Sequence, residues 1–104
     1  MTRQTIEITF NSAIKRAEQL DQCAEDMLRL ASSNMETIKG DISMAWQGDS
    51  ASAYLNKMDL TAANIRKTAK RLQDIASTLR GVAINFRNSE LRAIEIAEQR
   101  SYNS

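Results

Sequence analysis

Residues 45–50, Ala45-Trp46-Gln47-Gly48-Asp49-Ser50, lie almost midway along the chain and decide its fold. They include the only tryptophan and one of three glycines. Glycine often follows a helix C-terminus because it reaches positive φ without a steric cost. Asp49 and Ser50 are residue types that cap helix N-termini. The stretch therefore predicts that one helix ends here and that a second helix runs back along the first.

The composition favours helices and argues against several classes of protein. The chain has no proline, and only 5% of its residues are aromatic, which disfavours a sheet. A net charge of +1 gives no global field for nucleic acid or an anionic membrane. No apolar run approaches the roughly 18 residues of a membrane span, and the N-terminus lacks a signal-peptide layout. Composition alone predicts a cytoplasmic protein, or one exported without a cleaved signal peptide.

The residue types that usually carry catalysis and metal binding are scarce. There is no histidine, and Cys23 is the only cysteine, so neither an intramolecular disulfide nor a common zinc site can form. The commonest general base is absent as well. The acidic residues are scattered as on a solvated helix face. We therefore expect no enzymatic activity, no metal and no cofactor.

The apolar periodicity predicts an all-α chain forming a single antiparallel two-helix hairpin domain over residues 1–104. The first helix is expected over about 10–45, the turn over 46–50 and the second helix over about 51–86. Residues 1–9 are expected to be an extended or loosely packed lead, and 87–104 a helical extension or tail. Steps of three and four residues define both buried stripes. The first stripe is Ala17, Leu20, Ala24, Leu28, Ala31, Met35, Ile38, Ile42 and Ala45. The second is Ala51, Tyr54, Met58, Ala62, Ile65, Ala69, Leu72, Ala76, Leu79, Ala83 and Phe86.

A second set of apolar residues widens both stripes and predicts a partner surface. In such a hairpin, two residues lie opposite each other when their numbers add up to about 96. By this rule the set falls largely at one end of the hairpin. One helix pair cannot cover it, so we expect two hairpins to form a four-helix bundle. Alternatively, the lead or residues 91–100 fold back over it. Cys23 is expected to act as a small buried hydrophobe. The set is Leu20, Cys23, Met27, Leu30, Leu72, Ile75, Leu79 and Val82.

Trp46-Gln47-Gly48 at the hairpin turn, in a chain of about one hundred residues, resembles the WXG family. Asp49-Ser50-Ala51 and Tyr54 after the motif strengthen the match, which covers about residues 6–100. The resemblance implies a small helical substrate of type VII (Esx-type) secretion in Gram-positive bacteria. Trp46 is expected to close the open end of the hairpin, because an indole buries a large area while its N–H reaches a partner. The resemblance further implies that Trp46 and Gly48 contribute to recognition during export.

The family's second export element is a Tyr-x-x-x-Asp/Glu sequence after the second helix of a partner chain. The nearest counterpart here is 86–90, Phe86-Arg87-Asn88-Ser89-Glu90, in which phenylalanine replaces tyrosine. The spacing of four places Phe86 and Glu90 on one helix face. Either they act as a relaxed signal, or the chain is exported with a partner that carries the full one. Phe86 could also simply close the second stripe.

The resemblance leads to the expectation of a non-enzymatic protein, exported folded as a homodimer or with a related hairpin chain. The protein would be synthesised in the cytoplasm and act at the cell surface or outside the cell, without stable membrane insertion. Its partners would be the second hairpin and the secretion machinery. Two alternatives remain open: a targeting chaperone for a larger type VII toxin, and an unrelated cytoplasmic coiled-coil adaptor.

Overall fold

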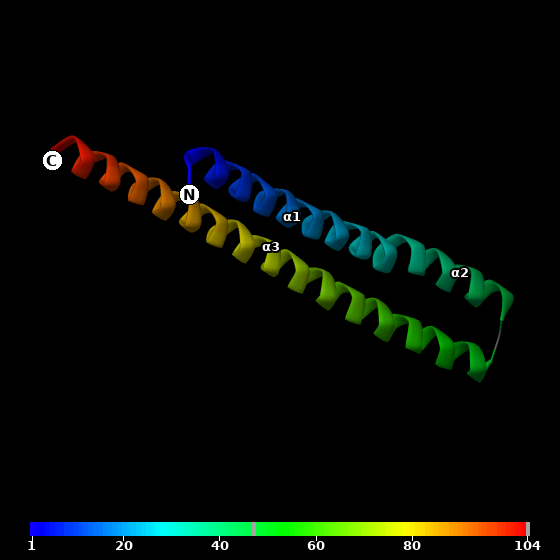
Figure 1. Ribbon diagram of the computed structural model, residues 1–104. Coiled ribbons are helices and arrows are strands. Elements are labelled where there is room, and N and C mark those ends of the chain that lie inside the picture. Colours follow the sequence, from blue (N-terminus) through cyan, green and yellow to red (C-terminus); the bar gives the residue numbers. More distant parts are fainter. Residues whose placement is uncertain (47, 104) are drawn as a thin grey trace. The chain divides into compact units, whose positions relative to one another are not determined.

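The computed structural model describes residues 1–46 and 48–103, and all of these except Met1, Thr2, Trp46 and Gly48 are helical (Figure 1). The elements are α1 (Arg3–Arg29), the π-helix η1 (Leu30–Asn34), α2 (Met35–Ala45) and α3 (Asp49–Asn103). The described residues contain no strand, so the expected all-α class is confirmed. The chain divides into two compact units, one of Met1–Leu20 with Asp74–Ser104, the other of Asp21–Gln73.

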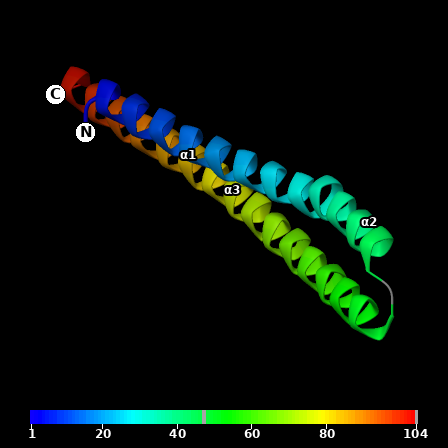
Figure 2. The same ribbon diagram turned by 90° about the vertical axis from the view of Figure 1, so that its right-hand side faces the viewer.

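The second unit contains the turn, where α2 and α3 run antiparallel (Figure 2). Trp46 is extended (φ −119°, ψ 142°), and its N–H donates to the Ile42 carbonyl at 2.8 Å. Gly48 has φ 102°, as expected for this glycine. Its carbonyl accepts from Ser52 N–H at 3.2 Å, so Gly48 is the residue that precedes the first turn of α3. The second helix thus begins at Asp49 rather than at 51. Gln47 lies outside the described residues.

In the second unit, the helix is irregular at η1, between the end of α1 and the start of α2. The Met35 N–H donates to the Leu30 carbonyl, a bond across five residues that widens the helix by one residue. Arg66 of α3 donates a long hydrogen bond of 3.4 Å to the Ala31 carbonyl inside this turn. Ala31 and Met35 pack with Ala62 in a small core, bordered by Met58 and Ile65. The apolar periodicity did not predict this π-turn, because its five residues are compatible with either helix.

In the first unit, the expectation of an extended or loosely packed lead over residues 1–9 is wrong: α1 begins at Arg3 and buries Ile6. Thr2 caps it, since its Oγ1 accepts from the Thr5 N–H at 3.1 Å and its carbonyl accepts from Ile6 at 3.0 Å. Ile6 is fully buried. Together with the half-buried Phe10, it continues the spacing of three and four residues towards the N-terminus. The helix therefore begins early because it has both a cap and apolar residues to bury.

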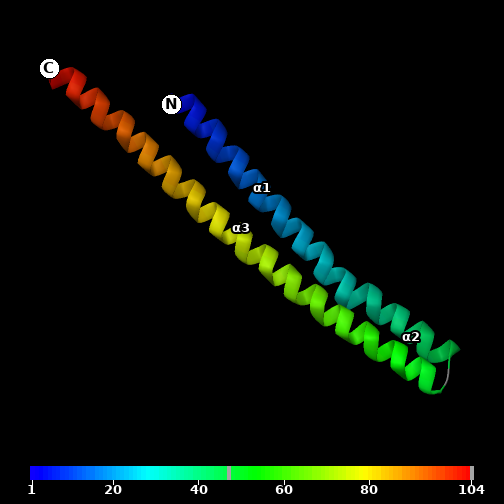
Figure 3. The same ribbon diagram turned by 60° about the horizontal axis from the view of Figure 1, so that its bottom comes forward.

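Of the two alternatives expected for residues 87–104, the helical extension is the one observed, because α3 continues unbroken to Asn103. Arg87, Asn88 and Ser89 are polar, but none of them breaks a helix as proline would. Leu91 and Ile94 are half-buried, so the inward-facing stripe continues past Phe86. Figure 3 shows the first unit with the end of α3 extending beyond the N-terminus of α1.

Alanine dominates the buried positions of both units. Among the described residues, eight of the ten buried hydrophobic residues are alanines, and Ile6 is the one large side chain that is fully buried. Small side chains let helix backbones approach closely, but each buries little apolar area. Much of the larger apolar content of the chain therefore remains at the surface. The buried alanines are Ala17, Ala24, Ala31, Ala51, Ala62, Ala69, Ala76 and Ala83.

Candidate functional site

The Trp46 ring lies at the surface of the turn. Its side chain is 54% exposed, so it covers the open end of the hairpin only in part. It meets Tyr54 edge-to-face, with ring centroids 5.9 Å apart and an interplanar angle of 62°. Tyr54, from the second turn of α3, is itself 49% exposed. Two half-exposed aromatic rings beside Gly48 therefore form a patch that another molecule can contact.

The eight residues expected to form a partner surface divide between the two units. Leu20, Ile75, Leu79 and Val82 belong to the first unit, and Cys23, Met27, Leu30 and Leu72 to the second. Half of the eight are exposed: Leu30 by 42%, Ile75 by 53%, Val82 by 59%, and the thiol of Cys23 as well. The other four are half-buried. The thiol of Cys23 is thus exposed in the single chain, and the burial expected for it requires a partner that covers this surface.

Within the first unit, an apolar hollow of about 200 Å³ opens at this surface. The polar part of its lining is negligible. Leu79 and Val82, from the expected partner surface, lie in its wall together with Phe86, from the expected export element. The structure thus joins two groups of residues that the sequence reading had treated separately. Thr9, Phe10, Ala13 and Ala83 complete the lining.

The sequence of α3 places apolar residues along one side of this helix and polar residues along the other. Residues 62–89 form four seven-residue repeats, AANIRKT, AKRLQDI, ASTLRGV and AINFRNS. Each begins with a buried alanine, followed by a large apolar residue at its fourth position and Arg or Gln at its fifth. The fourth and fifth positions lie on opposite sides of the alanine, because they are three and four residues further along the helix. The apolar positions are Ile65, Leu72, Leu79 and Phe86, and the polar ones Arg66, Gln73, Arg80 and Arg87.

The last arginine of these repeats holds the start of α1. Arg87 donates from Nε to Glu7 Oε1 at 2.7 Å, and its guanidinium carbon lies 5.1 Å from the centroid of the Phe10 ring. The Arg87 and Glu7 side chains are 39% and 40% exposed. We call Glu7, Phe10 and Arg87 the Arg87 clamp. The sequence did not predict this clamp, because residues 1–9 were expected to be extended or loosely packed. The arginine at the fifth position of three of the four repeats was the available signal.

Phe86 and Glu90, the expected export element, lie on one face of α3, both half-buried. Instead of following the second helix, they lie well inside it, with more than three turns beyond Glu90. They belong to the first unit, whereas Trp46 and Gly48 belong to the second.

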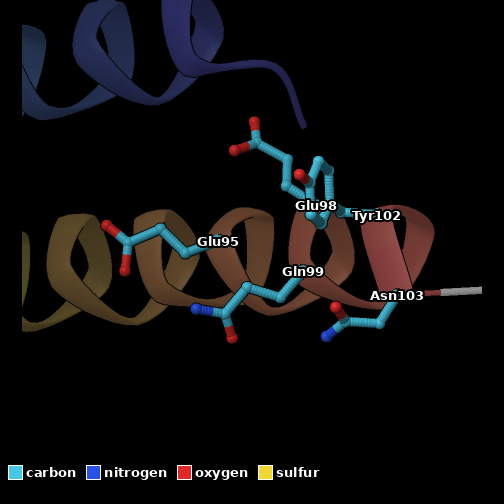
Figure 4. A pocket seen from close by; sticks show the side chains of 5 residues that line it. All are labelled: Glu95, Glu98, Gln99, Tyr102 and Asn103. Atoms are coloured by element: carbon cyan, nitrogen blue, oxygen red, sulfur yellow. The ribbon is translucent and has the colours of Figure 1, made fainter.

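A second ion pair ties the N-terminus of α1 to the last part of α3. Arg3 and Glu98 are joined at 2.5 Å, and the hydrogen bond from Arg3 lowers the pKa of Glu98. Figure 4 shows Glu98 beside Tyr102 on one helix face, and the Tyr102 side chain is 92% exposed. A shallow hollow of about 380 Å³ opens here. Glu95, Glu98, Gln99, Tyr102 and Asn103 line it, and all come from a single helix.

An analogous pair in the second unit links α2 to α3. Lys39 Nζ lies 2.5 Å from Asp59 Oδ1 and 3.5 Å from Glu36 Oε1. The hydrogen bond to Asp59 raises the pKa of Lys39. The ammonium group is thus held as a cation between two carboxylates, and this arrangement stabilises the helix pair rather than serving proton transfer.

The described residues also bear on metal binding and on membrane insertion. No group of three or more His, Cys, Asp or Glu side chains among them is arranged to hold a metal ion. No helix in this part of the chain combines the length and the apolar content needed to cross a membrane.

Comparison with known proteins places the chain in a family. The family model WXG100, described as proteins of 100 residues with WXG, matches residues 5–90. No curated protein and no solved structure shows significant similarity to the chain. The matched range covers most of both units and includes Trp46 and Gly48. This chain belongs to the WXG100 family, whose members are small proteins secreted by type VII systems.

Proposed function

We propose that the protein is a non-enzymatic type VII substrate that is exported folded, as a dimer of helical hairpins, and acts by helix–helix binding. The observation that supports this most directly is the alanine-rich core. Eight buried alanines hold the helices together, while Leu30, Ile75 and Val82 remain exposed. A chain of this size that leaves such residues in water gains stability from a partner that covers them.

The proposed partner surface is the apolar edge of the helix pair. In the first unit this edge carries Leu79, Val82 and Phe86 around the apolar hollow. The opposite edge carries Arg87 with its Glu7 partner, and burying such charged groups in an interface is costly. A second hairpin, either another copy or a related chain, therefore binds through the apolar edge. This one-sided arrangement closes at two hairpins instead of growing into a filament.

A matched pair of substitutions tests the proposed surface. Val82 and Ile84 are both exposed, by 59% and 46%, and lie two residues apart, on opposite sides of α3. Val82→Lys should produce a monomer, as measured by size-exclusion chromatography with light scattering, and reduce export. Ile84→Lys should leave both unchanged, because it is not on the apolar edge. A Val82→Lys protein that remains dimeric and exported contradicts the proposed surface.

The wild-type chain in the same experiment separates the functional alternatives. A stable dimer, alone or with a related chain, supports the dimeric substrate. A monomer that co-purifies with a larger secreted protein supports the targeting chaperone, which would use the same apolar edge. Absence from the culture supernatant, in a host whose type VII system is active, supports the cytoplasmic adaptor.

For the export element, we propose Phe86 and Glu90, with Trp46 and Gly48 as the second recognition element at the turn. The shared helix face of Phe86 and Glu90, together with the place of Phe86 in the apolar hollow, supports this choice. Glu90→Ala should leave the melting temperature unchanged but abolish export. Glu95→Ala, a control on the same helix at an exposed position, should be exported normally. Normal export of Glu90→Ala removes this element from the proposal.

A further inference from the structure

The start of α1 has weak local determinants. Its first turn contains no acidic residue and includes Arg3, whose positive charge is unfavourable beside the positive end of the helix dipole. Thr2 supplies one cap, and the first turns of a helix open readily when tertiary contacts are few. The order of these turns therefore depends on their contacts with α3. Two ion pairs join them to α3, and the Arg87–Glu7 pair of the Arg87 clamp is less exposed than the Arg3–Glu98 pair.

Arg87 makes two different contacts with α1. It forms a half-buried ion pair with Glu7, where solvent screens the charges less than at a fully exposed site. Its guanidinium also packs over the Phe10 ring, an interaction that a planar guanidinium makes better than an ammonium group. One side chain of α3 thus fixes two residues that are one helical turn apart on α1.

Phe10 connects the clamp to the proposed export element. Its side chain meets Arg87 and also lines the apolar hollow with Leu79, Val82 and Phe86. Arg87 is the residue after Phe86 and lies three residues before Glu90. If the start of α1 opened, Phe10 would leave the hollow, and Phe86 would lose a neighbour in the lining. The surface around Phe86 would then change without any change in α3.

We propose that Arg87 is a positioning residue: by holding Glu7 and Phe10, it keeps the first turns of α1 beside Phe86 and presents residues 86–90 as one fixed two-helix surface. The inference rests on the proposed export role of Phe86 and Glu90. The secretion machinery then recognises a surface formed by both helices, so export requires an ordered start of α1.

The experiment compares Arg87→Gln, Arg87→Lys and the control Arg92→Gln, all in the full chain. Arg92 is an exposed arginine on the same helix. Arg87→Gln should speed hydrogen exchange of residues 6–12 by about tenfold, because local opening becomes easier, while exchange within 21–73 stays unchanged. Export should fall by a similar factor. Arg87→Lys keeps the charge but not the planar stacking, and should give an intermediate value for both measurements.

If hydrogen exchange of residues 6–12 is unchanged in Arg87→Gln, the clamp does not order the start of α1. Faster exchange with wild-type export overturns its positioning role, provided that Glu90→Ala blocks export in the same host. An equal loss of export in Arg92→Gln also overturns that role, because the loss of any positive charge on α3 would then explain the result. Normal export of Glu90→Ala contradicts the export element itself, and with it the positioning role. The exchange data then decide separately whether the clamp orders α1.

Discussion

Replacing Trp46 with alanine tests how the turn contributes to stability and to recognition. The ring is 54% exposed, so somewhat less than half of its surface is covered. A tryptophan that buries about 150–250 Å² when fully covered then contributes about 100 Å² here. At about 25 cal/mol per Å², this area corresponds to about 2.5 kcal/mol. Compaction of the unfolded chain lowers the figure to about 2 kcal/mol.

The expected loss is therefore below the range of about 3–5 kcal/mol that a fully buried aromatic residue would give. It corresponds to a fall in melting temperature of roughly 10 °C for a chain of this size. Circular dichroism during thermal and urea unfolding measures it. Tyr102→Ala is the control, because that side chain is 92% exposed and its removal should leave stability unchanged.

A double-mutant cycle with Tyr54 isolates the ring contact. The edge-to-face geometry, with centroids 5.9 Å apart, should give a coupling free energy of about 0.5–1 kcal/mol between Trp46 and Tyr54. Trp46 is the only tryptophan, so its fluorescence also reports on the turn. Emission should shift to shorter wavelength when a partner covers the indole. A loss of stability above 4 kcal/mol, or one below about 0.5 kcal/mol, would refute the area reasoning.

Three further predictions concern two of the three glycines and the terminal ion pair. Gly81→Ala should stabilise the protein by about 1 kcal/mol in urea unfolding, because an added Cβ meets no atom within 4 Å and alanine favours a helix; a loss would indicate unseen crowding. Gly48→Ala should destabilise it by about 1–2 kcal/mol in the same assay, because φ is 102°; unchanged stability would contradict that turn geometry. Arg3→Gln should raise the pKa of Glu98 towards 4.5 in an NMR titration, because the hydrogen bond from Arg3 lowers it; an unchanged pKa would mean that the pair does not form in solution. Since the pKa of Glu98 is lowered in the folded state, the stabilisation by this pair is present above pH 4.5 and is lost as the pH falls through the folded-state pKa.

The helical class, the position of the turn and the family can all be inferred from the order of the amino acids. The stripes of apolar residues at steps of three and four exclude strands, and only helices satisfy them. The need for positive φ marked Gly48 as the turn residue, because that conformation is costly for any residue with a Cβ. These features follow from local backbone physics or from a short motif, so they can be predicted without knowing which distant residues are in contact.

The ends of the helices, and the pairs of residues that meet across them, depend instead on tertiary contacts. The start of α1 at Arg3 depends on the burial of Ile6 and on contacts with residues more than seventy positions away, which no local pattern records. Residues 87–89 look like an interruption in the sequence, yet Arg87 has a partner in Glu7, and the helix continues. The exposure of Trp46 and of Cys23 likewise depends on how closely alanine-lined helices pack, because burial is a property of neighbours and not of residue type.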